Sequence, residues 1–371
     1  MTIGVLKEPG YETRVSLPAE AVASLTKKGM TVLVEMDAGE RSFNSNADYQ
    51  KAGAQLKKRE DILPVSDIVL TMQSPPLSEL AVLDSRVIIG VYQPLSNAAL
   101  VSELLKYRVT AFSLDMLPRT TRAQSMDVLS SQANIAGYKA VLIAAEKYPR
   151  YFPMFMTAAG TIAPAKVLVL GAGVAGLQAI ATARRLGAVV EVFDTRPAVK
   201  EEVMSLGARF IEVEGAADAS RAGGYAVEQS DAYKEQQQRR IAESVQKADI
   251  IITTAQIPGR KAPILIPETM LDSMRSGSVI MDLAAATGGN TPVTRNNETI
   301  LYRGITVVGN SALAATMPSD ASKLYGKNIL NFLQLLIDKE GKLHLDWNDE
   351  LVKGSCVTHN GEVMNEKLKT P

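Results

Sequence analysis

Three closely spaced glycines, Gly171, Gly173 and Gly176, lie between an apolar run at residues 166–170 and an amphipathic segment. In this arrangement the first glycine permits a tight turn, the second lets the backbone approach a pyrophosphate, and the third allows a helix to pack closely on a strand. The N-terminus of that helix would offer N–H groups and a positive dipole end to the phosphates. A glycine-rich turn without a ligand is the simpler alternative. The predicted dinucleotide loop comprises Gly171, Ala172, Gly173, Val174 and Gly176.

An acidic residue follows the glycines at the spacing that a dinucleotide site requires. Asp194 ends the next apolar run, VVEVFD, about 20 residues after the loop. Its carboxylate can accept hydrogen bonds from the adenosine ribose and would repel a 2′-phosphate, so NAD(H) is favoured over NADP(H). Arg196 leaves NADP(H) open, because an arginine here can hold that phosphate; a solvated surface charge is the other interpretation. Asp194, Thr195 and Arg196 therefore join the predicted site.

A second polar cluster occurs in PRTTRAQSMDVLSS at residues 118–131. The chain has only two histidines, His344 and His359, so most of it cannot use imidazole as an acid or base. Hydride exchange between two nicotinamides transfers no proton in that step and needs positioning and electrostatics. Polar groups that do not titrate would suffice. The segment supplies such groups in Arg119, Arg122, Gln124, Ser125, Asp127, Ser130 and Ser131. A capping and salt-bridge cluster at a helix start is the alternative.

Two series of alternating strands and helices must position these groups. Short β-branched runs alternate with helical patterns over residues 2–114 and again over residues 166–309, which is typical of parallel sheets. Long helical patterns at residues 125–147 and 320–338 connect the two series. We therefore expect an α/β protein with two Rossmann-like doubly wound domains joined by long helices. The expected domains are residues 1–130 plus 318–371 and residues 131–317, with the nucleotide in a cleft.

Composition excludes several classes of protein. The 371 residues include 40 basic and 40 acidic side chains, which argues against a dedicated nucleic-acid surface. One cysteine and two histidines cannot build the usual structural zinc site, so no metal is expected. Neither a signal peptide nor a run of 18 apolar residues is evident, so we expect a cytoplasmic chain that does not itself span a membrane.

The quoted segments closely resemble the NAD(H)-binding domain in the alpha subunit of the proton-translocating NAD(P)+ transhydrogenases, which are Re/Si-specific. Further matches in order and spacing are FDTRPAVKEEVMSLGARF, AGGYAVEQSDAY, TTAQIPGRKAPILI and GSVIMDLAAATGGN. The resemblance implies that Arg119, Gln124, Asp127 and Ser130 contact the nicotinamide end of NADH. Gln124 would also bridge towards NADP(H) held on a partner subunit, so that hydride passes directly from NADH to NADP+.

The same resemblance adds binding residues and partners. The segment from 214 to 230 carries Gly224 and Tyr225, which match a mobile loop that closes over the nucleotide; an ordinary surface loop is the alternative. Gln237 matches another nucleotide contact, and Gln256 replaces a leucine usual in the family. A homodimer is implied, together with a membrane-spanning subunit and an NADP(H)-binding beta subunit. The chain would then be a separate soluble alpha subunit, or an alpha subunit cut at the domain end. It would be held peripherally at the inner membrane through these partners. The partners would translocate the protons.

A weaker resemblance to alanine dehydrogenase defines the main alternative. The pattern of Lys7, Glu8, Arg14 and Val15 is shared with that enzyme. However, Gln73 occupies the position of the enzyme's lysine, and GVYQPLS lacks its histidine, so the groups that bind and protonate a 2-oxo acid are missing. Arg14 is then a structural remnant. A non-catalytic protein that senses NAD(H) is the second alternative.

Overall fold

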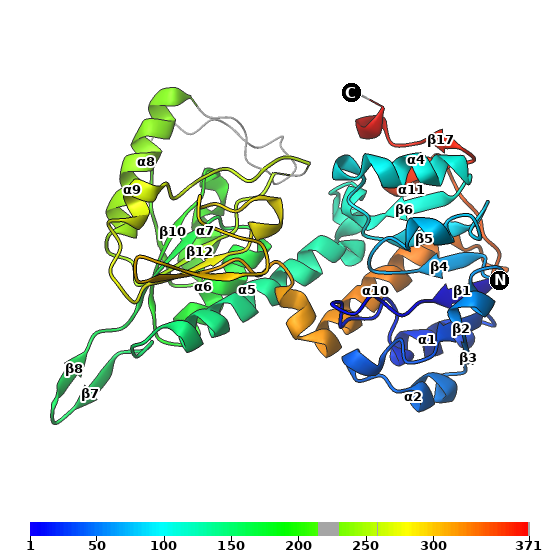
Figure 1. The fold of residues 1–371 in the computed structure, drawn as a ribbon, viewed down its shortest axis with the longest axis horizontal. Helices are drawn as coiled ribbons and strands as arrows, with labels where there is room; N and C mark the ends of the chain where they lie inside the picture. Colours follow the sequence, from blue (N-terminus) through cyan, green and yellow to red (C-terminus); the bar gives the residue numbers. More distant parts are fainter. Residues whose placement is uncertain (214–229, 258, 370–371) are drawn as a thin grey trace. The chain divides into compact units, whose positions relative to one another are not determined.

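The computed structural model describes residues 1–213, 230–257 and 259–369. It divides into two compact units (Figure 1): unit 1 comprises residues 1–132 and 315–371, and unit 2 comprises residues 133–314. Helix α5 (Val128–Lys147) begins in unit 1 and continues into unit 2. Each unit contains a parallel sheet with helices, which confirms the expected α/β class with two doubly wound domains.

Unit 1 is a doubly wound sheet whose strand order changes direction next to β1. In sheet order its strands are β17 (Glu362–Val363), β16 (Cys356–His359), β6 (Thr110–Ser113), β5 (Val87–Gly90), β4 (Ile68–Leu70), β1 (Thr2–Val5), β2 (Thr31–Glu35) and β3 (Gln55–Lys57). Strands β1 to β6 are parallel, whereas β16 and β17 extend the sheet in antiparallel fashion. Because β1 pairs with both β2 and β4, the crevice beyond its carboxyl end is the usual ligand position for this fold.

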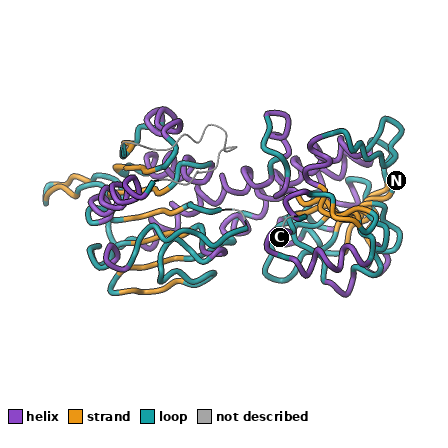
Figure 2. Tube along the Cα trace, turned by 90° about the horizontal axis from the view of Figure 1, so that it is seen from above, coloured by secondary structure: helices purple, strands orange, loops and turns teal. Residues whose placement is uncertain are grey.

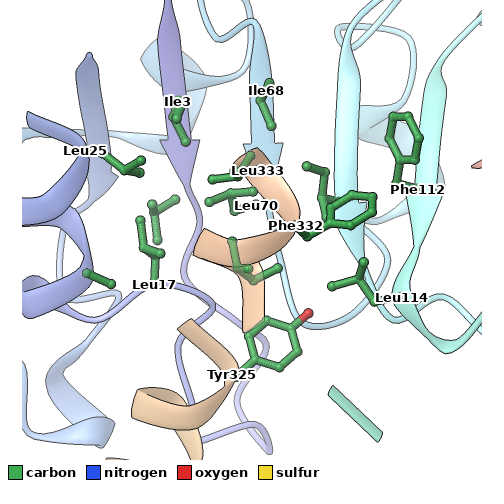
Figure 3. Packing of buried hydrophobic residues seen from close by; sticks show 14 of the residues in the cluster. Ile3, Leu17, Leu25, Ile68, Leu70, Phe112, Leu114, Tyr325, Phe332 and Leu333 are labelled. Atoms are coloured by element: carbon green, nitrogen blue, oxygen red, sulfur yellow. The ribbon is translucent and has the colours of Figure 1, made fainter. Parts of the chain in front are cut away.

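Helices cover both faces of this sheet. They are α1 (Ala19–Thr26), α2 (Asn46–Lys51), α3 (Arg59–Ile62), α4 (Ala98–Lys106), α10 (Pro318–Leu336) and α11 (Glu350–Ser355). Figure 3 shows Tyr325, Phe332 and Leu333 of α10 packed among the apolar residues of the sheet. Ile3 on β1 and Ile68 on β4 belong to the same buried cluster. Burial of this apolar face places the C-terminal part of the chain in unit 1.

Unit 2 repeats the strand order of unit 1. In sheet order its strands are β11 (Arg209–Phe210), β10 (Val189–Phe193), β9 (Lys166–Leu170), β12 (Ile250–Thr253), β13 (Val279–Asp282), β15 (Ile305–Val308) and β14 (Thr299–Tyr302). All neighbours are parallel except β14 with β15. The other elements are α6 (Val174–Arg185), α7 (Lys200–Ser205), α8 (Asp231–Val245), α9 (Glu268–Leu271) and the hairpin of β7 (Phe155–Thr157) and β8 (Gly160–Ile162).

Alternate side chains of the unit 2 strands enter different cores. Val167 and Val169 of β9 pack with residues of α5 and α6, whereas Leu168 and Leu170 pack with residues of α8 and α9. A parallel strand buried on both faces reads as a continuous apolar run, as KVLVL does. Figure 2 shows helices beside the strands of each unit. The strand order of unit 2 changes direction at the junction of β9 and β12, because β9 lies between β10 and β12.

The structure differs from the sequence expectations at particular elements. Helix α5 begins at Val128 rather than 125, because a 3₁₀ helix over Thr121–Met126 precedes it. The strand expected at residues 209–213 ends at Phe210. Short 3₁₀ helices, which sequence periodicity does not reveal, connect many elements: Glu40–Ser42, Leu77–Glu79, Pro94–Ser96, Leu114–Met116, Pro197–Val199, Ala285–Thr287, Leu313–Thr316 and Glu366–Leu368.

Candidate nucleotide site

The loop between β9 and α6 is shaped by its three glycines. Gly171 has φ +105°, a left-handed conformation that only glycine adopts without strain. A Cβ on Gly176 would lie 1.9 Å from the carbonyl oxygen of Gly171, so helix α6 approaches the loop closely. In contrast, no atom lies within 4 Å of a Cβ built on Gly173, which leaves open space beside the backbone at the helix N-terminus. This shape and the unpaired N–H groups of the first turn suit a phosphate.

The loop is also approached by a glycine in α5. A Cβ on Gly137 would lie 2.1 Å from the carbonyl oxygen of Ala175, so α5 and the first turn of α6 are in backbone contact within unit 2. Ala172 is buried, whereas Val174 is exposed. The backbone of the predicted loop therefore packs against α5 at Ala175, while the side of the loop at Gly173 and Val174 remains accessible.

Asp194 follows β10 and holds the loop from one side. Its Oδ2 accepts a hydrogen bond from the backbone N–H of Ala172 at 2.7 Å. Arg196 binds the same carboxylate through its backbone N–H and its guanidinium, which donates from Nε and Nη2 at 2.9 and 2.8 Å. Asp194 is only 8% exposed, and this pairing raises the pKa of Arg196. Thr195 between them is half-buried.

Thr254 holds the loop from the other side. Its hydroxyl is within hydrogen-bonding distance of the carbonyl oxygens of Leu170 and Gly171, at 3.3 and 3.2 Å. The position follows from the strand order, because β12 lies next to β9. The sequence analysis did not single out Thr254, although the doubly wound order it predicted places the end of this strand beside the glycine loop.

Asn290 fixes the chain that follows Thr254. Its buried amide accepts from the backbone N–H of Ala255 at 3.2 Å and donates to the carbonyl oxygens of Ala255 and Pro263 at 2.9 and 2.8 Å. The backbone N–H of Asn290 in turn donates to the buried carboxylate of Asp282 at 2.6 Å. Sequence reasoning missed both residues. Two features of the sequence could have indicated them: Asp282 is a polar residue at the end of an apolar strand, and Asn290 directly follows two glycines.

The remaining predicted contacts of unit 2 have different surroundings. Gln237 is buried on α8, one helical turn beyond Tyr233, which is also buried. Burial, followed by the charge of Asp194, raises the pKa of the Tyr233 phenol. Gln256 is exposed, and its Nε2 donates to the carbonyl oxygen of Leu283 at 2.7 Å. Gly224 and Tyr225 lie outside the described residues.

The four predicted nicotinamide contacts lie in unit 1, at the start of α5. Asp127 accepts from the backbone N–H of Ser130 at 2.9 Å and from its hydroxyl at 2.6 Å, which is the geometry of a helix N-cap. Arg119 and Gln124 are exposed. The structure therefore brings Asp127 and Ser130 together in a capping role. Such a role also fixes both side chains at the helix end.

The segment that follows β1 in unit 1 carries two buried carboxylates, Glu8 and Glu12. Burial raises the pKa of Glu8 to about 7, although the backbone N–H groups of Met72 and Gln73 donate to it at 2.6 and 3.3 Å. Burial also disfavours ionised Glu12, but its bonds with Arg14 outweigh that effect, so its pKa is lowered. The Arg14 guanidinium donates twice to Glu12 at 2.7 Å and once to Gln132 at 2.8 Å. Each nitrogen of the Arg14 guanidinium therefore donates one hydrogen bond within unit 1.

Both histidines of the chain belong to unit 1 but lie outside this acidic segment. His359 ends β16 and hydrogen-bonds Thr110, the first residue of β6, at the amino-terminal edge of the parallel strands. Its ring lies 4.6 Å from that of Trp347, and burial lowers its pKa. His344 is exposed. Among the residues described, no three His, Cys, Asp or Glu side chains are grouped as metal ligands. No helix within residues 1–213, 230–257 and 259–369 has the length and apolar character needed to cross a membrane.

These features define a two-unit α/β protein with a dinucleotide-type loop at the β9–β12 junction. Residues 4–136 and 140–366 match the N-terminal and C-terminal domains of the family described as alanine dehydrogenase/PNT. The chain belongs to this family.

Three known proteins place the chain within the family. It is 43% identical, over 99% of each chain, to a Rhodospirillum rubrum protein named as the first part of NAD(P) transhydrogenase subunit alpha. It is 44% identical to a transhydrogenase structure from Sinorhizobium meliloti, with a TM-score of 0.89 and coverage of 98% of this chain and 100% of that one. Alanine dehydrogenase of Staphylococcus epidermidis is more distant, at 27% identity over 99% of this chain and 96% of the enzyme.

Proposed function

We propose that this chain is the NAD(H)-binding component of a transhydrogenase and passes hydride directly from NADH to NADP+ on a partner subunit. The observation that carries the proposal is the 43% identity, over 99% of both chains, to the NAD(P) transhydrogenase subunit alpha protein of Rhodospirillum rubrum. When bound, the dihydronicotinamide supplies the hydride. The residues of this chain bind and orient the nucleotide, and no proton donor is required in the transfer step.

The geometry of unit 2 supports binding of the ADP half of NAD(H). Open space beside Gly173 suits the pyrophosphate, and the N-terminus of α6 provides N–H groups for it. Asp194 lies at the end of β10, where a carboxylate meets the adenosine ribose in this fold. We assign Ala172, Val174, Thr195, Gln237 and Gln256 to the surroundings of the nucleotide, and Gly224 and Tyr225 to its closing loop.

In unit 1, we propose that Arg119, Gln124, Asp127 and Ser130 serve the nicotinamide end. Gln124 is exposed, and the family resemblance assigns to it the contact with a second nicotinamide. The capping bonds between Asp127 and Ser130 hold the start of α5, and therefore the 3₁₀ helix that carries Gln124. The role of Gln124 is thus contact with the reacting ring, whereas Asp127 also acts by positioning.

The surroundings of Arg14 argue against the alternative, an alanine dehydrogenase. A 2-oxo acid needs a cation for its carboxylate and a proton donor for its carbonyl. Here the Arg14 guanidinium is paired with the carboxylate of Glu12 and donates to Gln132, and Gln73 cannot supply a proton as a lysine would. His359 is hydrogen-bonded at the opposite edge of the sheet. These contacts favour transfer between two nicotinamides.

The proposal includes partners that hold NADP(H) and translocate protons. We infer a homodimer, a membrane-spanning subunit and an NADP(H)-binding beta subunit, with this chain on the cytoplasmic side of the inner membrane through its partners. The names of the relatives support partner subunits. The relative from Haemophilus influenzae, for example, is named NAD(P) transhydrogenase subunit alpha.

A reconstitution experiment tests the function. The chain is mixed with a purified NADP(H)-binding transhydrogenase domain, and hydride transfer from NADH to an NADP+ analogue with a distinct reduced absorbance is followed by stopped flow. We expect rapid transfer by the wild type and a rate at least tenfold lower for Gln124→Asn, with little change in NADH affinity. Gln50→Asn makes the same change at an exposed site on α2 and should transfer normally.

Two outcomes would contradict the proposal. If NADH binds but no transfer occurs with the partner domain, the chain is not a transhydrogenase component. If the chain alone oxidises NADH in the presence of pyruvate and ammonia, it is an alanine dehydrogenase. Large loss of NADH binding in Gln124→Asn with normal transfer would refute the bridging role of that residue alone.

A further inference from the structure

The Asp194 carboxylate has every acceptor position filled by this chain. Oδ1 accepts from the backbone N–H of Arg196 at 2.8 Å and from its Nε at 2.9 Å. Oδ2 accepts from the backbone N–H of Ala172 at 2.7 Å and from Arg196 Nη2 at 2.8 Å. An ionised carboxylate offers about four lone-pair positions, and these four donors use them all. A ribose hydroxyl can bind Asp194 only after one of the donors leaves.

The two backbone donors are fixed by the fold. Ala172 is buried in the loop between β9 and α6, and the backbone of Arg196 is only two residues from the carboxylate. The guanidinium is different, because it ends a flexible side chain that is 19% exposed. The charge of Glu202 on α7 also raises the pKa of Arg196, after the larger effect of its hydrogen bond with Asp194. The arginine side chain is therefore the donor that can be displaced.

From this geometry we infer that Arg196 is an internal competitor of the adenosine ribose at Asp194 and thereby sets nucleotide specificity. The inference rests on the proposed NAD(H) site. A ribose must replace the guanidinium, which lowers affinity for NADH. The displaced guanidinium remains tethered beside the ribose, where its planar fork suits a 2′-phosphate. Asp194 thus restrains an NADP(H)-binding group while it selects NAD(H).

Removal of the guanidinium tests the competition directly. Titration calorimetry on the full chain compares NADH and NADPH binding to wild type, Arg196→Met and Arg196→Lys. Methionine keeps an unbranched stem but donates no hydrogen bond, so Arg196→Met should bind NADH roughly three- to tenfold more tightly. It should bind NADPH more weakly than the wild type. Arg196→Lys keeps the charge without the fork and should fall between the two.

A change in NADH affinity in the other direction would overturn the inference. If Arg196→Met binds NADH with equal or lower affinity than the wild type, the guanidinium is a neutral neighbour or a direct nucleotide contact. Melting temperatures identify variants that fail to fold, and Arg196→Leu provides a second substitution without a hydrogen-bond donor if Arg196→Met is among them.

Variants of Asp194 separate this inference from the proposed site. Asp194→Asn should erode the preference for NADH over NADPH, and Asp194→Asn combined with Arg196→Met should remove the NADPH binding gained. Unchanged selectivity in Asp194→Asn would mean that the carboxylate is not at the ribose, so the site assignment itself would fail. Altered selectivity without tighter NADH binding by Arg196→Met would refute only the competition.

Discussion

Gly176 and Gly173 are both in the phosphate loop but are required for different physical reasons. A methyl group at Gly176 would lie 1.9 Å from the Gly171 carbonyl oxygen, whereas one at Gly173 meets no protein atom within 4 Å. Gly176→Ala must therefore push α6 away from the loop, at a cost of roughly 1–3 kcal/mol for overpacking. We expect a lower melting temperature and weaker NADH binding.

Gly173→Ala is the matched control for that prediction. Its added methyl group would fill the space proposed for the pyrophosphate, so NADH binding should fall by about tenfold or more while the melting temperature stays near that of the wild type. Calorimetry and thermal unfolding measure the two effects. Equal stability losses in both variants would mean that the space beside Gly173 is not a ligand site.

Glu8 predicts a pH-dependent stability. Burial, opposed by the backbone N–H groups of Met72 and Gln73, raises its pKa from 4.5 to about 7; the charge of Glu12 also raises it, and that of Arg59 lowers it. The folded state therefore holds a proton that the unfolded state has released between these pH values. Stability falls as the pH rises from 4.5 to 7, by up to about 3 kcal/mol.

Replacement of Glu8 removes this contribution. Between pH 5 and 8, the melting temperature of Glu8→Gln should fall less than that of the wild type, whereas Glu60→Gln at an exposed site should follow the wild type. The comparison uses thermal unfolding in buffers of constant ionic strength. Parallel pH profiles for Glu8→Gln and the wild type would show that Glu8 is ionised throughout this range.

At the scale of elements, the end of β12 is predicted to maintain the glycine loop through one hydroxyl. Thr254 Oγ1 is 3.2 Å from the Gly171 carbonyl oxygen. Thr254→Val keeps the shape but cannot donate, which leaves that carbonyl without this bond and should cost about 1 kcal/mol in NADH affinity, or roughly fivefold. Thr254→Ser keeps the hydroxyl and should bind NADH nearly as the wild type does.

The contrast between serine and valine decides whether that hydroxyl matters. Both variants are titrated with NADH well below their melting temperatures. Thr254→Ser keeps the hydroxyl and lacks only the methyl group, so a loss in Thr254→Ser as large as that in Thr254→Val would show that the hydroxyl alone does not maintain the loop and that side-chain packing contributes. Asn290, which hydrogen-bonds the backbone of the adjacent Ala255, would then be the stronger candidate for positioning the chain that follows β12.

The sequence predicted elements best where the apolar pattern is continuous. KVLVL forms β9 at residues 166–170, because a strand buried on both faces consists of apolar residues alone. The start of α5 was placed too early, because the capping interaction of Asp127 with Ser130 was one of two interpretations of the same polar residues. Thr254 and Asn290 escaped detection because their partners are distant in sequence, and only the folded sheet brings them together.

At the scale of the whole molecule, the alternation of strands and helices was sufficient to predict two doubly wound sheets. It did not predict the antiparallel additions, β14 in unit 2 and β16 with β17 in unit 1. These strands are short, and their pairing depends on contacts such as Thr358 with Ala111, far apart in the chain. The β7–β8 hairpin, which projects from unit 2 in Figure 1, is likewise too short for a periodic signal.

The shared strand order of the two units has a consequence for stoichiometry. In each unit the strand order changes direction beside one strand, which is where a Rossmann fold can accept a nucleotide, but the segments after these two strands differ in chemistry. After β9 come glycines and open space; after β1 come the buried carboxylates of Glu8 and Glu12. Glu8 already accepts from the backbone N–H groups of Met72 and Gln73, so these donors are not open to a pyrophosphate. Although its two units share a strand order, the chain should therefore bind one nucleotide rather than two.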